Sequence, residues 1–127
     1  MFTTHCFIRK NTLELRNKLR DIGYRQNIYD TNDYPWLAVN HNMFISVSKG
    51  FEHLPEFNID CGENEDLFLA LAALRDDKKP DYQWFVWDDI EDEGEKFKQY
   101  IPGEPWQEWW WFEVHKATIE ELIEHFK

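Results

Sequence analysis

The sequence predicts an α+β fold in which three helices pack on a mostly antiparallel sheet of about five to six strands, within a single domain spanning residues 1–127. The first observation is a recurring pattern. A short apolar run, a polar step and a helical segment follow one another three times, which gives the order β-α-β-β-(β)-α-β-β-α. The second is size: with 127 residues, of which 43% are hydrophobic, the chain can bury one core without disulfides or metal ions.

The first unit consists of a strand at residues 5–8 (HCFI) and a helix at residues 12–23. We expect Asn11 to cap this helix, with Glu14 three residues later, and Gly23 to end it. The apolar side chains of the segment are spaced as on one face of a helix. They are Leu15, Leu19 and Ile22.

The middle of the chain contains a predicted hairpin and a predicted central helix. The runs WLAVNH (36–41) and MFISVS (43–48) are separated by little more than Asn42, which favours two paired strands. In the second unit, residues 57–77, acidic side chains precede the run LFLALAAL (67–74), which is apolar on every face. A helix of this kind is normally covered on both sides, so we expect it at the centre of the domain.

The last part of the chain is predicted to form two strands and a helix. The strands are QWFVWD (83–88) and residues 109–116. The helix begins at Thr118, which is expected to form a capping box with Glu121. Its apolar stripe consists of Ile119, Leu122, Ile123 and Phe126.

Tryptophans dominate the segment WQEWWW, where four of them occur within six positions. Alternation along residues 109–116 places two tryptophans on the same face as two polar side chains. We predict that this face binds a protein partner or a second copy of the chain, because tryptophan is enriched at binding hot spots. A structural role is equally open, in which the C-terminal helix or the loop YDTNDYPW (29–36) covers the rings. The predicted partner-binding residues are Trp87, Trp109, Trp111, Glu113 and His115.

The net charge of −11 is unevenly distributed along the chain. Residues 1–27 carry six basic and two acidic residues, whereas residues 28–127 carry 8 basic and 23 acidic residues. Most of the molecule would repel a phosphate backbone, so we do not expect direct nucleic-acid binding. Arg16 and Arg20 lie one turn apart on the first predicted helix. We favour a solvated face, balanced by the protein's own acidic loops, over a patch that binds phosphate or an acidic partner.

No motif in the sequence indicates a catalytic site, a cofactor or a metal centre. The acidic run DDIEDEGE (88–95) resembles a calcium loop, but Tyr100 stands where the bidentate glutamate is needed. The five histidines lack zinc spacing, and a site assembled from His5 and Cys61 is less favoured than single buried residues. Nucleophile elbows and phosphate-binding loops are absent from the sequence. We therefore do not expect an enzyme, and we expect Cys6 and Cys61 to be buried thiols.

Three segments, IDCGENEDLFLALAALRDD (59–77), YQWFV (82–86) and HKATIEELIEHF (115–126), resemble small proteins encoded in prophages and mobile elements of gut bacteria. The resemblance is confined to segments, and it implies a bacterial or phage protein from an accessory gene. It brings no activity to particular residues. The sequence also shows no signal-peptide pattern, and its longest apolar run has eight residues. We therefore expect a cytoplasmic protein that does not enter the membrane.

These observations favour a non-catalytic accessory protein that binds another protein through the aromatic strand face. One alternative is an acidic decoy that imitates nucleic acid and occupies a DNA-binding protein, which the charge of residues 28–127 would suit. Another is a small-ligand or carbohydrate-binding module that uses ring stacking and carboxylate hydrogen bonds.

Overall fold

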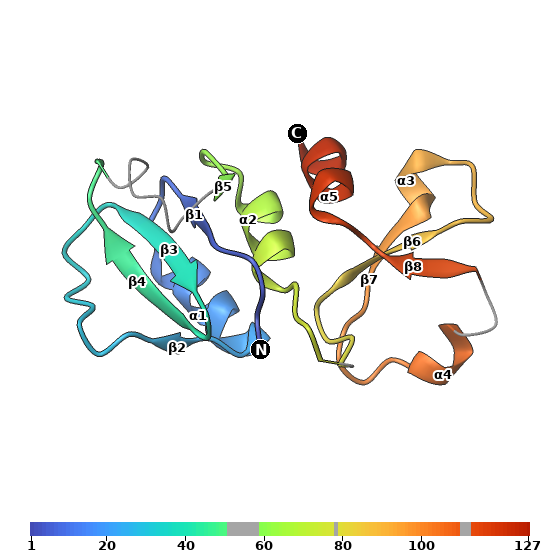
Figure 1. Ribbon diagram of the computed structural model, residues 1–127, viewed down its shortest axis with the longest axis horizontal. Coiled ribbons are helices and arrows are strands. Elements are labelled where there is room, and N and C mark those ends of the chain that lie inside the picture. The colour runs from blue at the N-terminus through green and yellow to red at the C-terminus, as the bar shows by residue number, and fades with distance from the viewer. Residues whose placement is uncertain (51–58, 78, 110–112) are drawn as a thin grey trace.

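The computed structural model describes residues 1–50, 59–77, 79–109 and 113–127, and these form an α+β fold, as predicted (Figure 1). Within these ranges, eight strands form two sheets, and two four-residue helices accompany three longer ones. The elements in chain order are β1 (Cys6–Ile8), α1 (Leu13–Ile22), β2 (Arg25–Gln26), β3 (Trp36–Asn40), β4 (Met43–Val47), β5 (Ile59–Asp60), α2 (Glu65–Ala72), β6 (Trp84–Trp87), α3 (Glu93–Lys96), β7 (Phe97–Gln99), α4 (Trp106–Trp109), β8 (Val114–Lys116) and α5 (Ile119–Phe126).

The strands form two sheets and not the predicted single sheet. The larger sheet has the strand order β2-β4-β3-β1-β5 and is mixed, with two antiparallel and two parallel pairings. The predicted hairpin of β3 and β4 is confirmed, with Trp36 opposite Val47 and Asn40 opposite Met43. β1 is antiparallel to β3, but β5 runs parallel to β1 and β2 runs parallel to β4. Parallel pairing needs a long connection, and both parallel pairs are separated by other elements along the chain. Alternation in the sequence identifies the faces of a strand, but it does not identify neighbours.

The smaller sheet has the order β7-β6-β8 and is antiparallel throughout. The predicted strand over residues 109–116 is wrong at its start, because Trp109 ends the short helix α4 and β8 begins only at Val114. Residues 110–112 lie outside the described part of the chain. Helical geometry at this point brings Trp106 and Trp109 to the same ring, that of Phe85, with centroid distances of 5.0 and 5.7 Å.

The ends of the longer helices follow the predicted chemistry with one correction. The N-cap of α1 is Thr12, whose side chain accepts a hydrogen bond from the amide of Leu15, and not Asn11. Gly23 ends α1 with a φ of 129°, a conformation that strongly favours glycine. The capping box of Thr118 and Glu121 at the start of α5 is confirmed.

The predicted central helix is α2, which lies between the two sheets and contacts α1, β1 and α5 (Figure 1). Phe68 and Leu71 of α2 are fully buried. The hydrophobic core around them continues into α1 on one side and into β6 and α5 on the other, where Val86 and Leu122 are also fully buried. A helix that is apolar on every face is stable here because both sheets remove it from water.

Candidate functional site

The structure brings two of the predicted site residues together, but it buries them. Trp87 on β6 and Trp109 at the end of α4 are 7% and 8% exposed, and their ring centroids lie 5.3 Å apart in an edge-to-face arrangement. They belong to an aromatic cluster with Phe85 and Tyr100 on one face of the smaller sheet. The described rings therefore pack against one another, with α4 as part of their cover. The expected cover by the C-terminal helix or by residues 29–36 is wrong for these rings, because the described cluster includes no residue of either segment, and α5 packs with Val86 on the other face of the sheet.

The other predicted site residues lie apart from this cluster or outside the described residues. In the pairing of β6 with β8, Val114 stands opposite Trp87 and His115 stands opposite Val86. Directly opposite residues share a face, so His115 points away from the aromatic cluster and toward α5. Glu113 is exposed, and its backbone carbonyl accepts a hydrogen bond from the amide of Asp88. Trp111 lies outside the described residues.

His115 lies between two carboxylates on the α5 side of the smaller sheet. Its Nδ1 is 2.8 Å from Asp88 Oδ1, and its Nε2 is 3.0 Å from Glu121 Oε1. The hydrogen bond with Asp88 raises the pKa of His115, burial opposes this shift, and Glu121 adds to it. Both ring nitrogens donate when the ring is charged, so the imidazolium links β8 to α5 and to the segment after β6.

The free energy of unfolding should therefore depend on the protonation of His115. A raised pKa in the folded state means that this stabilisation is complete below about pH 6.5, the ordinary pKa of histidine, and is lost as the pH rises through the raised value. We expect the urea midpoint of the wild type to fall across this window and that of His115→Gln to fall less. Urea titrations at several pH values test this, and equal pH dependence in both proteins would contradict it.

Three exposed apolar side chains lie on a separate feature, a loop between β2 and β3 that we call the apolar turn (residues 27–34). Ile28 is 87% exposed, Tyr29 is 79% exposed and Tyr34 is 49% exposed. The backbone closes tightly at the tip, because the amide of Asp30 donates to the carbonyl of Asn27 at 2.9 Å. The side chain of Asn27 also accepts from the amide of Tyr29, which fixes an Asx-turn.

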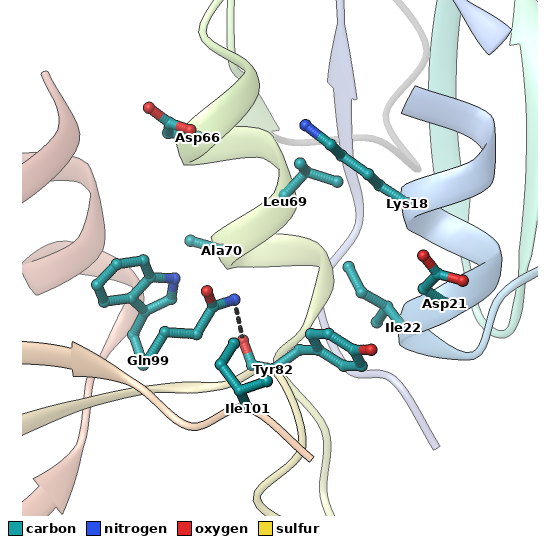
Figure 2. Close-up of a pocket in the computed structure, with 10 residues that line it drawn as sticks. Lys18, Asp21, Ile22, Asp66, Leu69, Ala70, Tyr82, Gln99 and Ile101 are labelled. Carbon is teal, nitrogen blue, oxygen red and sulfur yellow. Dashed lines mark hydrogen bonds between the residues drawn. The ribbon is translucent and has the colours of Figure 1, made fainter. Parts of the chain in front are cut away.

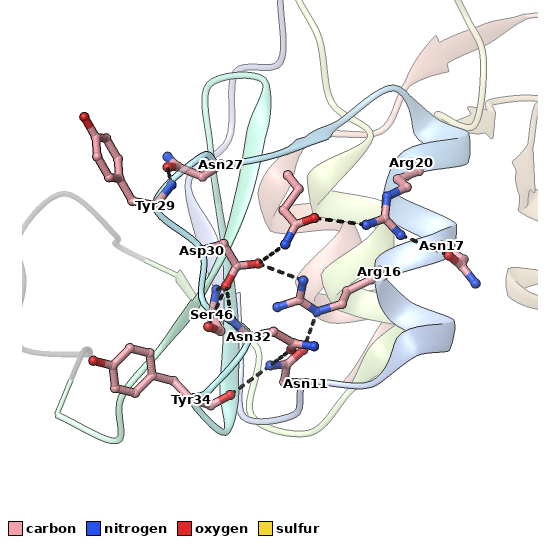
Figure 3. Close-up of polar contacts among 11 residues, drawn as sticks. Asn11, Arg16, Asn17, Arg20, Asn27, Tyr29, Asp30, Asn32, Tyr34 and Ser46 are labelled. Atoms are coloured by element: carbon pink, nitrogen blue, oxygen red, sulfur yellow. Dashed lines mark hydrogen bonds and ion pairs between the residues drawn. The ribbon is translucent and has the colours of Figure 1, made fainter.

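A buried carboxylate anchors the apolar turn from below. The side chain of Asp30 is fully buried, and one of its oxygens lies 2.7 Å from Nη1 of Arg16 on α1, which is also buried. The other oxygen accepts hydrogen bonds from the hydroxyl and the amide of Ser46 on β4, at 2.7 and 3.1 Å, and from the amide of Asn32 at 2.9 Å. Figure 3 shows these contacts converging on Asp30 while the rings of Tyr29 and Tyr34 point away from it.

Asn11 connects the second end of the apolar turn to the same network. Its side-chain oxygen accepts from Nε of Arg16 at 2.8 Å, and its amide nitrogen donates to the carbonyl of Tyr34 at 2.8 Å. One asparagine therefore links the helix to the loop, which explains why Thr12 and not Asn11 caps α1. The contacts of Asn11, Arg16 and Asp30 hold both ends of the apolar turn against α1 and β4.

The electrostatics of Asp30 match this geometry. Burial alone would raise its pKa, but the hydrogen bonds from Arg16 and Ser46 and from the amides of Asn32 and Ser46 outweigh it, so the pKa lies well below the usual range. The carboxylate is therefore charged at neutral pH. The acidic partner of Arg16 is thus one of the protein's own loops, as predicted, although the contact is buried and not solvated.

The chain matches no known family model, no curated protein and no solved structure. The resemblance to proteins of prophages and mobile elements stays a prediction. In the described ranges, no group of three or more histidine, cysteine, aspartate or glutamate side chains is arranged to hold a metal ion. None of the helices described has both the length and the apolar composition needed to cross a bilayer. Cys6 and Cys61 are buried and free, as expected for structural thiols.

Proposed function

We propose that the protein is a non-catalytic protein-binding module that contacts its partner through the apolar turn. One observation carries the proposal: Ile28 and Tyr29 are almost fully exposed, whereas the next side chain, Asp30, is fully buried in an ion pair. Turn tips usually carry glycine, proline, asparagine, aspartate or serine, because these residues suit the backbone or the solvent. An isoleucine and a tyrosine at such a tip are better suited to a contact with another molecule.

The anchoring contacts favour tight binding because they hold the loop in one conformation. Association costs entropy for every loop and side chain that becomes ordered, and a loop fixed in advance avoids part of this cost. Tyrosine is suited to such a surface because it offers a large contact area with only two rotatable side-chain bonds. We infer that the partner presents an apolar depression that accepts Ile28 and Tyr29, with Tyr34 at its edge.

This proposal keeps the predicted class of function, protein binding or self-association, and moves the surface away from Trp87 and Trp109. It also differs from the acidic-decoy hypothesis in its dependence on salt. Binding through apolar side chains changes little with ionic strength, whereas binding by an acidic surface weakens steeply as salt increases.

The test compares affinity purification with wild-type protein, with the double variant Ile28→Ser/Tyr29→Ser, and with Leu13→Ser. Leu13 is a matched control, because it is 71% exposed but lies at the start of α1. We expect a partner, or a second copy seen by light scattering, to associate with the wild type and the control but not with the double variant, at low and moderate salt. The proposal would be rejected if all three proteins associated equally. It would also be rejected if the wild type bound neither a partner nor a second copy of itself.

A further inference from the structure

A cleft lies where α1, α2 and the smaller sheet meet, on a different part of the molecule from the apolar turn. Its volume is about 260 Å³, slightly below the range of about 300–1,000 Å³ that is typical of ligand pockets, which limits the cleft to a small ligand. α1 contributes Lys18 and Asp21, and α2 contributes Asp66 and Leu69. The third wall includes Trp84 of β6. Figure 2 shows the cleft between these elements.

Charged groups of both signs lie at one end of the cleft. Figure 2 shows the ammonium group of Lys18 and the carboxylate of Asp66 there, and the side chains of Tyr82 and Ile101 at the other end. The carboxylate of Asp21 lies on the α1 side of the cleft, and Gln99 lies next to Ile101. Lys18 also contacts Glu14 at 3.1 Å, but both side chains are about half exposed or more, and such pairs contribute little to stability. The ammonium group can therefore exchange this contact for a ligand. One end of the cleft thus offers an ammonium group and a carboxylate, and the other offers aromatic and aliphatic side chains next to the amide of Gln99.

Tyr82 occupies an unusual backbone conformation at this wall. Its φ is 64°, in the left-handed region, which is a genuine outlier for a bulky residue. Two hydrogen bonds hold the residue there: its amide donates to the carbonyl of Tyr100 at 2.8 Å, and its carbonyl accepts from the side chain of Gln99 at 2.9 Å. Strained residues of this kind are concentrated at ligand-binding positions, and here the strain places the phenol ring in the cleft.

We propose that this cleft binds a small zwitterion with an apolar body, of the class of free amino acids with an aromatic or branched side chain. The carboxylate of the ligand meets Lys18, its ammonium group meets Asp66, and its side chain lies against Tyr82, Trp84 and Leu69. Because α1, α2 and the smaller sheet all line the cleft, a bound ligand contacts all three elements. A ligand that binds only the folded protein stabilises it, so the melting temperature should rise when the ligand is added.

The test is protein-detected NMR with L-phenylalanine and two analogues, phenethylamine, which lacks the carboxylate, and 3-phenylpropionate, which lacks the ammonium group. We expect saturable shifts at the amides that line the cleft with L-phenylalanine, and binding weaker by about tenfold or more for each analogue, since each loses one charge-assisted hydrogen bond. Glucose serves as a comparison for a stacked saccharide. No saturable shift with L-phenylalanine or L-leucine up to their solubility, equal binding of an analogue, or binding of glucose instead would overturn the proposal.

Variants separate the charged end of the cleft from a general change in the fold. Lys18→Gln and Asp66→Asn should each weaken binding of L-phenylalanine by about tenfold or more. Lys127→Gln should leave it unchanged, because Lys127 forms a comparable exposed pair with Glu124 outside the cleft. Equal weakening by all three variants would reject the assigned contacts. The double variant Ile28→Ser/Tyr29→Ser should bind L-phenylalanine as tightly as the wild type does. The cleft and the apolar turn are therefore tested independently of each other.

Discussion

Arg16→Met is expected to lower the free energy of unfolding by about 3–5 kcal/mol. The side chains of Arg16 and Asp30 are 4% and 0% exposed, so the substitution leaves a buried carboxylate without its cation. Ser46 and Asn32 would still donate hydrogen bonds to Asp30, but neutral donors do not replace the charge. Urea unfolding at neutral pH, with the unfolding slope compared between variants, measures this loss.

The double variant Arg16→Met/Asp30→Leu shows whether the loss comes from the unpaired charge. Replacing both members of a buried pair by apolar groups is often nearly neutral, so we expect the double variant to be more stable than Arg16→Met alone. If it is less stable than the single variant, the network matters through the hydrogen bonds of Asp30 with the apolar turn and not through charge pairing. The double variant should also loosen the turn, and a faster amide exchange at Tyr29 would report this.

The ion pair of Arg16 and Asp30 also makes the free energy of unfolding depend on pH in the acidic range. The pKa of Asp30 is lowered in the folded state, so its contribution is present above its unfolded pKa of about 3.9 and is lost as the pH falls toward the folded value. The urea midpoint of the wild type should therefore fall on acidification below about pH 5. A variant without the pair should lose less stability over the same range. His115 acts in the opposite direction, because its raised pKa removes stability as the pH rises.

Much of the fold could be predicted because local signals decide it. The apolar spacing of α1, the glycine at position 23, the all-apolar run of α2 and the capping box at Thr118 each depend on residues close in sequence, and each is confirmed. The short strand β5 lies in the second predicted unit, but β2 could not be predicted from local signals. β2 has two residues and exists only because β4 pairs with it.

The candidate site could not be located from the sequence, because its decisive contacts join distant residues. Arg16 and Asp30 are on different elements, and nothing in the helical pattern of α1 distinguishes Arg16 from the more exposed Arg20. The signal in the sequence is the segment YDTNDYPW, which is predicted only to cover the tryptophans. Apolar residues at a turn, next to an aspartate that can accept several backbone hydrogen bonds, would have been the better indication of a displayed loop.

Trp109→Ala is expected to lower the free energy of unfolding by about 3–5 kcal/mol. This substitution tests whether Trp109 belongs to a core or to a binding surface. The ring of Trp109 is 8% exposed and contacts Phe85, Trp87, Tyr100 and Trp106, so its removal leaves a cavity in the aromatic cluster. Trp106→Ala is the matched control, because the ring of Trp106 lies only three residues away but is half-buried, and its loss should cost clearly less. Thermal unfolding of both variants, with near-ultraviolet circular dichroism to follow the aromatic packing, measures the difference.

A Trp109→Ala variant as stable as the wild type would mean that this ring is not part of a core, and would favour the predicted partner-binding face over the packing described above. A large loss confined to Trp109→Ala would assign the ring to the core, so that the search for a binding surface concentrates on Ile28 and Tyr29.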